Sequence, residues 1–270
     1  MKKIAVVNQK GGVGKTSTSV TLAAYLGLMD KKTLLVDLDP QGNATSGLGI
    51  EKNSVEFSVY HALLENTPLS QIIAETQVSN LKIMPSNVNL TGAEVELVSE
   101  IGREKRLTKA LEKVQDEFEF AIIDCAPSLG LLTLNALTAA DSVLIPIQCE
   151  YYALEGLGQL IKTIELVKDH LNSHLYIEGI LMTMADARTK LTEQVIQEVQ
   201  THFPDKIYST IIPRSVKMSE APGFGKPIML YDKESLVSKK YEEFTKEFLS
   251  RNPHNRLESH ESTFQYQEGE

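Results

Sequence analysis

The sequence is poor in several residue types that would mark a specialised class of protein. Its 270 residues include no tryptophan and only two cysteines, Cys125 and Cys149. Two cysteines are too few for a disulfide framework and lack metal-ligand spacing, so we expect a reducing cytoplasm. No apolar run approaches about 18 residues, which argues against a membrane span. No charged-then-apolar leader opens the chain, so we also expect no secretion signal.

An excess of basic residues is missing as well. The chain has 36 acidic residues against 27 Lys and Arg, which gives a formal net charge of −9. This balance argues only weakly against a nucleic-acid partner, because net charge averages over all faces and binding needs one local basic patch. The remaining composition, 42% hydrophobic and 23% charged, is that of a globular protein at the upper size of a single domain.

What the sequence does contain is an alternation of short apolar runs and helical patterns. Runs rich in Val, Ile or Leu predict strands covered on both faces, at 3–7, 33–36, 81–84, 120–124, 143–147, 177–182 and 208–212. Helical patterns fall between them at 17–29, 59–64, 103–117, 131–139, 155–171 and 192–203. The alternation predicts an α/β fold: a mostly parallel, twisted sheet flanked by helices, with right-handed crossovers.

We predict one domain, residues 1–250, and a tail, residues 251–270. The domain closes with an amphipathic helix at 235–249, whereas the tail is polar and acidic. The tail cannot bury enough surface to offset its ordering entropy, so we expect it to be disordered. The last helix could instead tether the chain to a membrane, but such helices carry an excess of Lys or Arg, so packing onto the domain is favoured.

The most informative motif is the glycine-rich stretch KGGVGKT, residues 10–16. It joins the predicted strand 3–7 to the predicted helix 17–29. Glycines let backbone N–H groups converge on an anion, and the helix start adds partial positive charge. Lys15 can reach the β- and γ-phosphates, and the Thr16 hydroxyl can ligate Mg²⁺. The stretch therefore predicts a phosphate-binding loop (P-loop).

One position departs from the usual P-loop pattern. Gln9 stands where the first glycine is expected, and a second lysine, Lys10, follows it. From the residues alone, Lys10 is either a solvated loop charge or a second phosphate ligand.

Two carboxylates, Asp37 and Asp39, directly follow the second predicted strand. Ligands of open α/β sheets bind at the carboxyl ends of the strands, and side chains at i and i+2 of extended chain point the same way. One carboxylate could hold Mg²⁺ indirectly while the other orients a water molecule. The alternative is a helix N-cap followed by a turn at 40–42. The neighbouring P-loop favours the functional interpretation.

Asp124 closes the apolar run 121–123 and precedes a loop that contains Pro127 and Gly130. An Asp at the end of a buried strand, across from a P-loop, is the Walker B arrangement, in which the carboxylate ligates Mg²⁺ directly or through water. The loop suits a segment that senses the γ-phosphate and moves on hydrolysis. Any strand end can carry a capping Asp, so this interpretation depends on the P-loop.

Phosphoryl transfer needs a positioned water and neutralised charge rather than covalent chemistry from the protein. We therefore predict three roles: Lys15 and Lys10 stabilise charge, Thr16 and Asp124 bind Mg²⁺, and Asp39 aligns the water beside an indirect contact to the metal. Asp37 is the second candidate for the water.

These motifs carry a specific resemblance. Residues 10–16, 37–43 and 124–128 resemble the deviant Walker A ATPases, and within that group the chain is similar to the ParA/Soj partitioning proteins. Further similar stretches lie at 42–49, 146–156 and 219–222, and the likeness runs from about residue 3 to 241. Two positions differ from frequent family residues: Ala126 replaces a proline and Ser17 a threonine, whose hydroxyl serine retains.

The resemblance implies a P-loop NTPase that binds ATP and Mg²⁺ and hydrolyses ATP slowly without an activator. In that family Lys10 would be the signature lysine, reaching across an ATP-bound dimer to the partner's nucleotide. Gly11 would lie where the protomers meet, and Asp39 would be the water-positioning acid. The expected nucleotide contacts are Lys10, Gly11, Gly12, Val13, Gly14, Lys15, Thr16, Ser17 and the backbone near Pro213.

The resemblance also implies the partners. The dimer would bind double-stranded DNA without sequence preference, and a ParB-type centromere-binding protein would stimulate hydrolysis and release it. We expect a cytoplasmic, nucleoid-associated protein that binds no membrane. Basic residues lie near predicted loops at Arg188, Lys190, Arg214, Lys217, Lys226, Lys239 and Lys240. Scattered Lys and Arg usually serve solubility, and only Arg188 and Lys217 are singled out as DNA contacts, through the resemblance.

Three other functions share parts of this pattern. A MinD-type membrane-cycling ATPase would need a lipid-binding C-terminal helix. An iron–sulfur electron donor of the nitrogenase iron-protein type would need two suitably placed cysteines per chain. A nucleotide-binding adaptor would bind ATP without hydrolysing it.

Overall fold

A seven-stranded, twisted sheet forms the centre of the computed structural model, which describes residues 1–65, 67–150, 153–186 and 188–252. The strands are β1 (Lys2–Val6), β2 (Thr33–Leu38), β3 (Ala74–Glu75), β4 (Leu81–Met84), β5 (Phe120–Cys125), β6 (Ser142–Gln148) and β7 (Tyr176–Thr183). Their order is β3-β4-β2-β5-β1-β6-β7, parallel except for the short β3. The predicted α/β class is confirmed.

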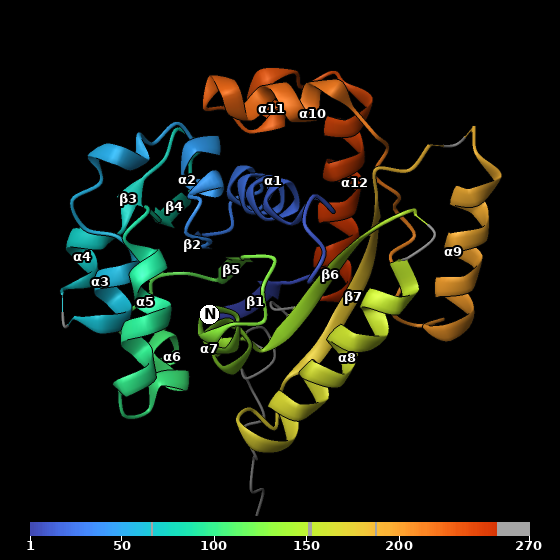
Figure 1. Cartoon of the computed structure of the whole chain (residues 1–270). Helices are drawn as coiled ribbons and strands as arrows, with labels where there is room; N and C mark the ends of the chain where they lie inside the picture. The colour runs from blue at the N-terminus through green and yellow to red at the C-terminus, as the bar shows by residue number, and fades with distance from the viewer. Residues whose placement is uncertain (66, 151–152, 187, 253–270) are drawn as a thin grey trace, which may run out of the picture.

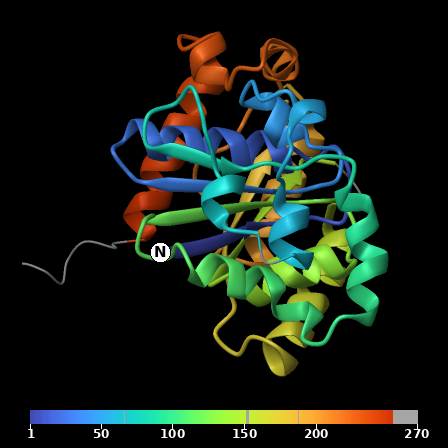
Figure 2. The same ribbon diagram turned by 90° about the vertical axis from the view of Figure 1, so that its left-hand side faces the viewer.

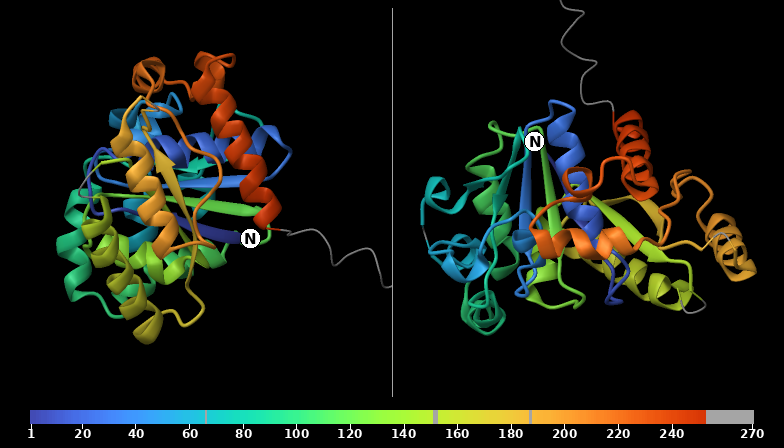
Figure 3. Two further views of the ribbon diagram at one scale, coloured as in Figure 1. Left: turned by 90° about the vertical axis from the view of Figure 1, so that its right-hand side faces the viewer. Right: turned by 90° about the horizontal axis from the view of Figure 1, so that it is seen from above.

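Helices cover both faces of the sheet (Figures 1 and 3). On one face lie α1 (Lys15–Leu28), α2 (Asn43–Gly47), α10 (Val216–Glu220), α11 (Ile228–Tyr231) and α12 (Leu236–Arg251). The other face carries α3 (Val59–Leu64), α4 (Leu69–Ile72), α5 (Leu90–Glu96), α6 (Arg106–Glu112), α7 (Leu131–Ala139), α8 (Ala153–His170) and α9 (Lys190–His202). Side chains of β1 and of Val7, the residue after it, alternate between the two cores: Ile4 and Val6 join the first, Ala5 and Val7 the second.

The C-terminal helix packs onto the domain, as the sequence predicts. Phe244 and Phe248 of α12 are completely buried, and the Tyr241 hydroxyl lies 3.0 Å from that of Thr18 in α1. The apolar face of this helix is therefore not free to enter a lipid surface. None of the helices in the described ranges has the length and apolar character needed to cross a bilayer.

Two predicted elements differ from the structure. Residues 208–212 are extended but do not form a regular strand. The N–H groups of Tyr208 and Ile212 donate to β7 (2.9 Å each), but those of Ser209 and Thr210 between them donate to the Glu247 carboxylate of α12 (2.8 and 2.9 Å), which interrupts the pairing. The helix predicted at 103–117 is shorter: a 3₁₀ turn, Arg103–Lys105, leads into α6, which ends at Glu112.

The tail boundary also moves. Arg251 ends α12, and Asn252 is held by a hydrogen bond from its Nδ2 to Glu178 Oε1 (2.6 Å). Both residues therefore belong to the domain, although the sequence assigned them to the tail. The rest of the predicted tail, 253–270, lies outside the described residues.

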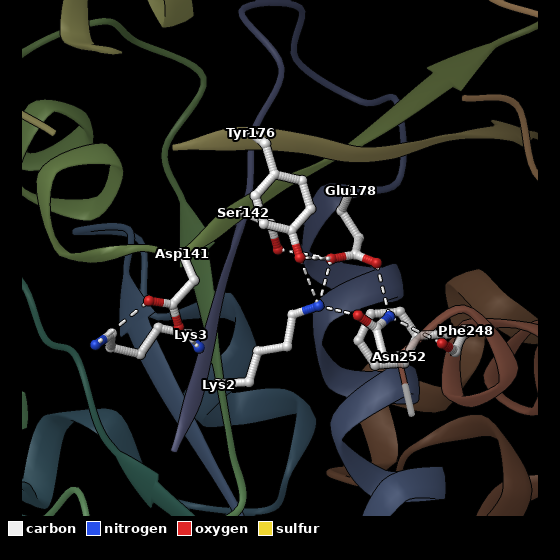
Figure 4. A network of polar contacts seen from close by, with 8 residues as sticks. All are labelled: Lys2, Lys3, Asp141, Ser142, Tyr176, Glu178, Phe248 and Asn252. Atoms are coloured by element: carbon white, nitrogen blue, oxygen red, sulfur yellow. Dashed lines mark hydrogen bonds and ion pairs between the residues drawn. The ribbon is translucent and has the colours of Figure 1, made fainter. Parts of the chain in front are cut away.

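A buried polar network fixes this end of α12 to the amino-terminal ends of the strands (Figure 4). Glu178 of β7 accepts from Lys2 Nζ of β1 (2.8 Å) and from Ser142 Oγ of β6 (2.7 Å), besides Asn252. Burial alone would raise the pKa of Glu178, but the bonds from Lys2, Asn252 and Ser142 outweigh it and hold the pKa below the usual value near 4.5. The network ties three strands and the last helix together.

Replacing Glu178 with glutamine is expected to destabilise the fold by about 2 kcal/mol or more at pH 7, because it leaves the buried Lys2 ammonium uncompensated. A carboxylate with a lowered pKa contributes stability above its unfolded-state value and loses it as the pH falls through the folded-state value. The E178Q deficit should therefore shrink toward acid pH. Urea unfolding at several pH values measures it, with Glu75→Gln as an exposed control. Equal stability of E178Q and wild type at pH 7 would contradict the assignment.

Candidate nucleotide site

The P-loop has the shape that an anion requires. It connects β1 to α1, with Gly12 at φ +75° and with Gly14 at φ +87° as the N-cap of α1. Both conformations are left-handed, so a residue with a Cβ would be strained there. No side chain caps the helix start, which leaves its first N–H groups for a ligand.

Two side chains outside the motif hold the loop on both sides. Asn8 donates from Nδ2 to the carbonyl of Pro146 (2.7 Å) and accepts from the Lys10 N–H (2.9 Å). Thr183, the last residue of β7, donates from Oγ1 to the carbonyl of Val13 (2.8 Å). The loop is therefore anchored to β6 and to the end of β7.

The two lysines of the motif have different surroundings. Lys15 is 6% exposed, and its Nζ donates to the Lys10 carbonyl at 3.0 Å, so it folds back over the loop. Burial lowers the pKa of Lys15, while the charge of Asp124 opposes that shift. The Lys10 side chain is 43% exposed and forms an ion pair with Glu150 after β6. Lys10 is thus neither freely solvated nor folded over the phosphate loop.

Strand register brings the predicted carboxylates together. In the pairing of β2 with β5, Asp37 lies directly opposite Asp124, and in that of β1 with β5, Val6 lies opposite Asp124. Both carboxylates are completely buried, and Asp39 is 7% exposed. Three acidic side chains therefore gather at the carboxyl edge of the sheet, beside the loop that leaves β1.

Asp37 and Asp39 differ in what they bind. Asp37 Oδ2 accepts from the N–H and the hydroxyl of Thr45 in α2 (2.8 and 2.6 Å), so this carboxylate holds α2 in place. Among the residues that the structure describes, Asp39 Oδ1 accepts a single and local bond, from the Gln41 N–H (2.9 Å). Asp37 therefore has a structural role, which is to hold the start of the next helix. Asp39 keeps a carboxylate oxygen that can bind a water molecule.

Asp124 has an incomplete set of partners. Its Oδ1 accepts from Ser19 Oγ of α1 at 2.8 Å, whereas its Oδ2 is buried with no hydrogen-bond partner in the described structure. Burial, and next the nearby charge of Asp37, raise the pKa of Asp124 to about 8. A buried, unpaired carboxylate oxygen of this kind fits a divalent cation, which would supply the missing partner.

The donor set fits Mg²⁺ bound together with phosphates. Within the described ranges no group of three or more His, Cys, Asp or Glu side chains could hold a metal alone. Mg²⁺ commonly takes one or two protein oxygens, several waters and substrate phosphates. Asp124 and the Thr16 hydroxyl, which lowers the pKa of Asp124, are the residues that could supply the protein oxygens.

The other predicted site residues lie apart from the P-loop. Arg188 and Pro213 line a cavity of about 570 Å³ between α9 and α12, together with Lys240. Lys217 is on α10, above α1 in Figure 1. A second cavity, of about 500 Å³, lies beside Thr16 and Ser17, between α1, α2 and the turn that follows α10.

Sequence reasoning missed four residues that shape the site: Asn8, Ser19, Glu150 and Thr183. Ser19 follows Thr16 by three residues and so lies on the same side of α1. It is therefore the one of the four that the helical spacing of the sequence could have predicted. The other three come from positions that only the tertiary structure brings close.

Fold and site together define a P-loop nucleotide hydrolase with a second lysine in its phosphate loop. A family model described as an AAA domain matches residues 1–177. The chain is 59% identical over 246 residues to the sporulation initiation inhibitor protein Soj of Bacillus subtilis, covering 91% of this chain and 97% of that protein. It is 52% identical over 248 residues to the chromosome partitioning protein ParA of Myxococcus xanthus, covering 92% and 88%. The chain therefore belongs to the ParA/Soj family.

Solved structures agree with the fold. A cobyrinic acid a,c-diamide synthase from Mycobacterium smegmatis, solved with bound ADP and magnesium, is 36% identical with a TM-score of 0.83, covering 95% of this chain and 97% of that one. A plasmid partition protein from Borrelia burgdorferi bound to AMPPNP is 26% identical with a TM-score of 0.78, covering 93% and 99%. The resemblance read from the sequence motifs is confirmed.

Proposed function

We propose that this protein is an ATP-driven switch for moving DNA: its ATP-bound dimer binds DNA nonspecifically, and a ParB-type partner releases it by stimulating hydrolysis. The chain is a chromosome-partitioning ATPase with ATP and Mg²⁺ as its cofactors. The observation that carries the proposal is the P-loop with Lys10 ahead of its glycines, set against the buried Asp124 and the available carboxylate of Asp39.

Each residue of the site has a role in this proposal. The N–H groups of residues 11–17 bind the phosphates, Lys15 offsets their charge, and Thr16 and Asp124 hold Mg²⁺. When bound, Mg²⁺ neutralises charge on the β- and γ-phosphates. Asp39 orients the attacking water from the neighbouring strand end, and the backbone near Pro213 contacts the base.

Lys10 acts across the dimer. In the single chain its ammonium pairs with Glu150, and both side chains are more than two-fifths exposed. Such an exposed pair contributes little stability, so Lys10 can leave it at low cost when a second protomer arrives. The lysine then reaches the partner's nucleotide, with Gly11 at the point of closest approach.

Arg188 and Lys217 are the proposed DNA contacts. Arg188 is 89% exposed and forms a bidentate pair with Asp186 (2.8 and 2.7 Å), and Lys217 pairs with Asp232. Both are surface ion pairs that phosphate can displace. The acidic net charge of the chain does not oppose this, since two protomers present two such sets on one surface. We therefore propose that the protein acts in the cytoplasm, at the nucleoid.

The double variant R188A/K217A is expected to weaken ATP-dependent binding of duplex DNA by about tenfold or more near 100 mM salt. The slope of the logarithm of the binding constant against the logarithm of the salt concentration should become shallower by about one for each lost phosphate contact. A gel shift with ATP and with ADP, at two salt concentrations, measures both effects. The control K82A/K246A removes two exposed, ion-paired lysines elsewhere. Equally tight binding with ADP, or by R188A/K217A, would contradict the proposed function.

A further inference from the structure

An exposed apolar strip lies on the segment between β4 and α6. Val95 is 76% exposed, Val98 58% and Ile101 93%. Val95 and Val98 are three residues apart where α5 continues into the 3₁₀ turn Leu97–Ser99, so they share one side. We call Val95, Val98 and Ile101 the α5 ridge. Single exposed apolar residues are ordinary, but three within seven residues form a candidate contact surface.

The ridge is held firmly and faces outward. On the opposite side of the same segment Leu90, Ala93 and Leu97 are completely buried in the core. Figure 2 shows α5 at the side of the molecule away from the N-terminus, the side where the P-loop lies. A partner on the ridge would therefore sit near the nucleotide edge of the sheet.

Free acidic groups border the ridge. Glu94 and Glu96 flank Val95, and among the described residues neither forms an ion pair; Glu96 accepts only from the Tyr60 hydroxyl (2.9 Å). The other two acids of this segment, Glu100 and Glu104, are already paired with Arg106 and Arg103. The ridge therefore offers apolar contact beside two carboxylates that lack a cation.

Glu94 connects the ridge to the loop after Asp124. Its carboxylate lies against the backbone of Gly130, so closely that a Cβ at Gly130 would overlap it. Glu94 Oε1 is buried there without a hydrogen-bond partner. Gly130 precedes α7 and follows Leu129, which is 40% exposed. Glu94 therefore packs directly against the last residue of this loop before α7.

We propose that the α5 ridge, with Glu94 and Glu96, docks a cationic amphipathic segment of the partner that activates hydrolysis. The proposal rests on the proposed function, because it assigns a surface to that partner. A lysine or arginine of the segment draws Glu94 away from Gly130 while apolar side chains cover Val95, Val98 and Ile101. Docking thereby changes the loop that follows the Mg²⁺ ligand Asp124.

Charge selects this occupant over the alternatives. Nucleic acid and anionic lipid carry phosphates, which the two free carboxylates repel. A second copy of the chain on the same patch would bring the same carboxylates face to face, and like charges opposed at an interface are unfavourable. A cationic, partly apolar protein segment satisfies both the ridge and the acids.

The test uses the full chain and the ParB-type protein of the same genome. The triple variant V95S/V98S/I101S should need about tenfold or more partner for half-maximal stimulation, since losing even one well-buried apolar contact costs about that factor. Its unstimulated hydrolysis and ATP-dependent DNA binding should stay within about twofold of wild type, because the changes are on the surface. The control L28S/L166S alters exposed leucines on α1 and α8 and should be stimulated like wild type.

A photo-crosslinker placed at residue 95, with residue 166 as control, identifies the occupant. A crosslink from 95 to a Lys- or Arg-containing segment of the partner supports the proposal, as does weaker stimulation of Glu94→Lys. Normal stimulation of the triple variant, or a crosslink from 95 to a second copy of the chain, overturns it and leaves the proposed function standing. A wild-type chain that neither binds DNA with ATP nor responds to the partner overturns the proposed function, and the docking proposal with it.

Discussion

Replacing Asp39 with alanine is expected to lower the rate of ATP hydrolysis by about a hundredfold or more, because a positioned acid or base contributes that much to moving a proton in the transition state. ATP and Mg²⁺ should still bind, since Lys15, Thr16 and Asp124 are unchanged. The chain should therefore accumulate as an ATP-bound dimer that holds DNA. Size-exclusion chromatography with ATP, followed by a gel shift, measures this.

The neighbouring carboxylate gives the matched comparison. Asp37 accepts two hydrogen bonds from Thr45 and so holds α2. Asp37→Asn should therefore lower the free energy of unfolding by about 1–3 kcal/mol, because it leaves buried polar groups unpaired, and should reduce turnover less than D39A does. Asp116→Ala changes an exposed acid and should do neither. If D39A still turns over ATP at the wild-type rate while D37N does not, the water-positioning role belongs to Asp37.

The second large effect concerns Lys10. The variant K10Q should bind ATP as a monomer within about threefold of wild type, because the Lys10 ammonium pairs with Glu150, whereas Lys15 is the lysine that folds back over the P-loop. Hydrolysis should fall by about a hundredfold or more, since a cation supplied in trans to a transferring phosphoryl group is worth at least that. By contrast, K15Q should lose nucleotide binding itself. Calorimetric titration with ATP and a phosphate-release assay separate the two variants.

Mixing two inactive chains tests whether Lys10 acts across the dimer. In a K10Q–D39A heterodimer, the D39A chain supplies Lys10 to the K10Q chain, whose own Asp39 is intact. Half of the randomly paired dimers would then have one working site of two, which predicts about a quarter of wild-type activity. A mixture as inactive as its components would mean that Lys10 serves its own nucleotide.

The sequence predicted the parts of the fold that depend on local pattern. Buried strands read as apolar runs, and a glycine-rich turn between strand and helix has few other uses, so the P-loop and the ends of β2 and β5 were predictable. Their register could then be expected to bring Asp37, Asp39 and Asp124 to one edge. The structure places all three at that edge, because β2 and β5 are neighbours in the sheet.

Tertiary contacts decided the rest. Residues 208–212 have the composition of a strand, but Glu247, nearly forty residues away, takes two of their N–H groups, and no local pattern reveals that competition. The roles of Asp37 and Asp39 look equivalent in sequence and separate only because Thr45 lies within reach of one. Helix α5 is short and half exposed, so its apolar periodicity is too weak to predict it.

The ion pair of Lys10 with Glu150 in the single chain has a consequence for how the rate of ATP hydrolysis depends on protein concentration. Because the role proposed for Lys10 needs a second protomer, a chain without a partner is expected to hydrolyse ATP slowly at any ATP concentration. Turnover per chain should then climb with the amount of protein, as in any reaction that needs two copies to meet. Dilute chains would then hydrolyse little ATP, and most hydrolysis would occur where bound DNA raises the local concentration of the protein.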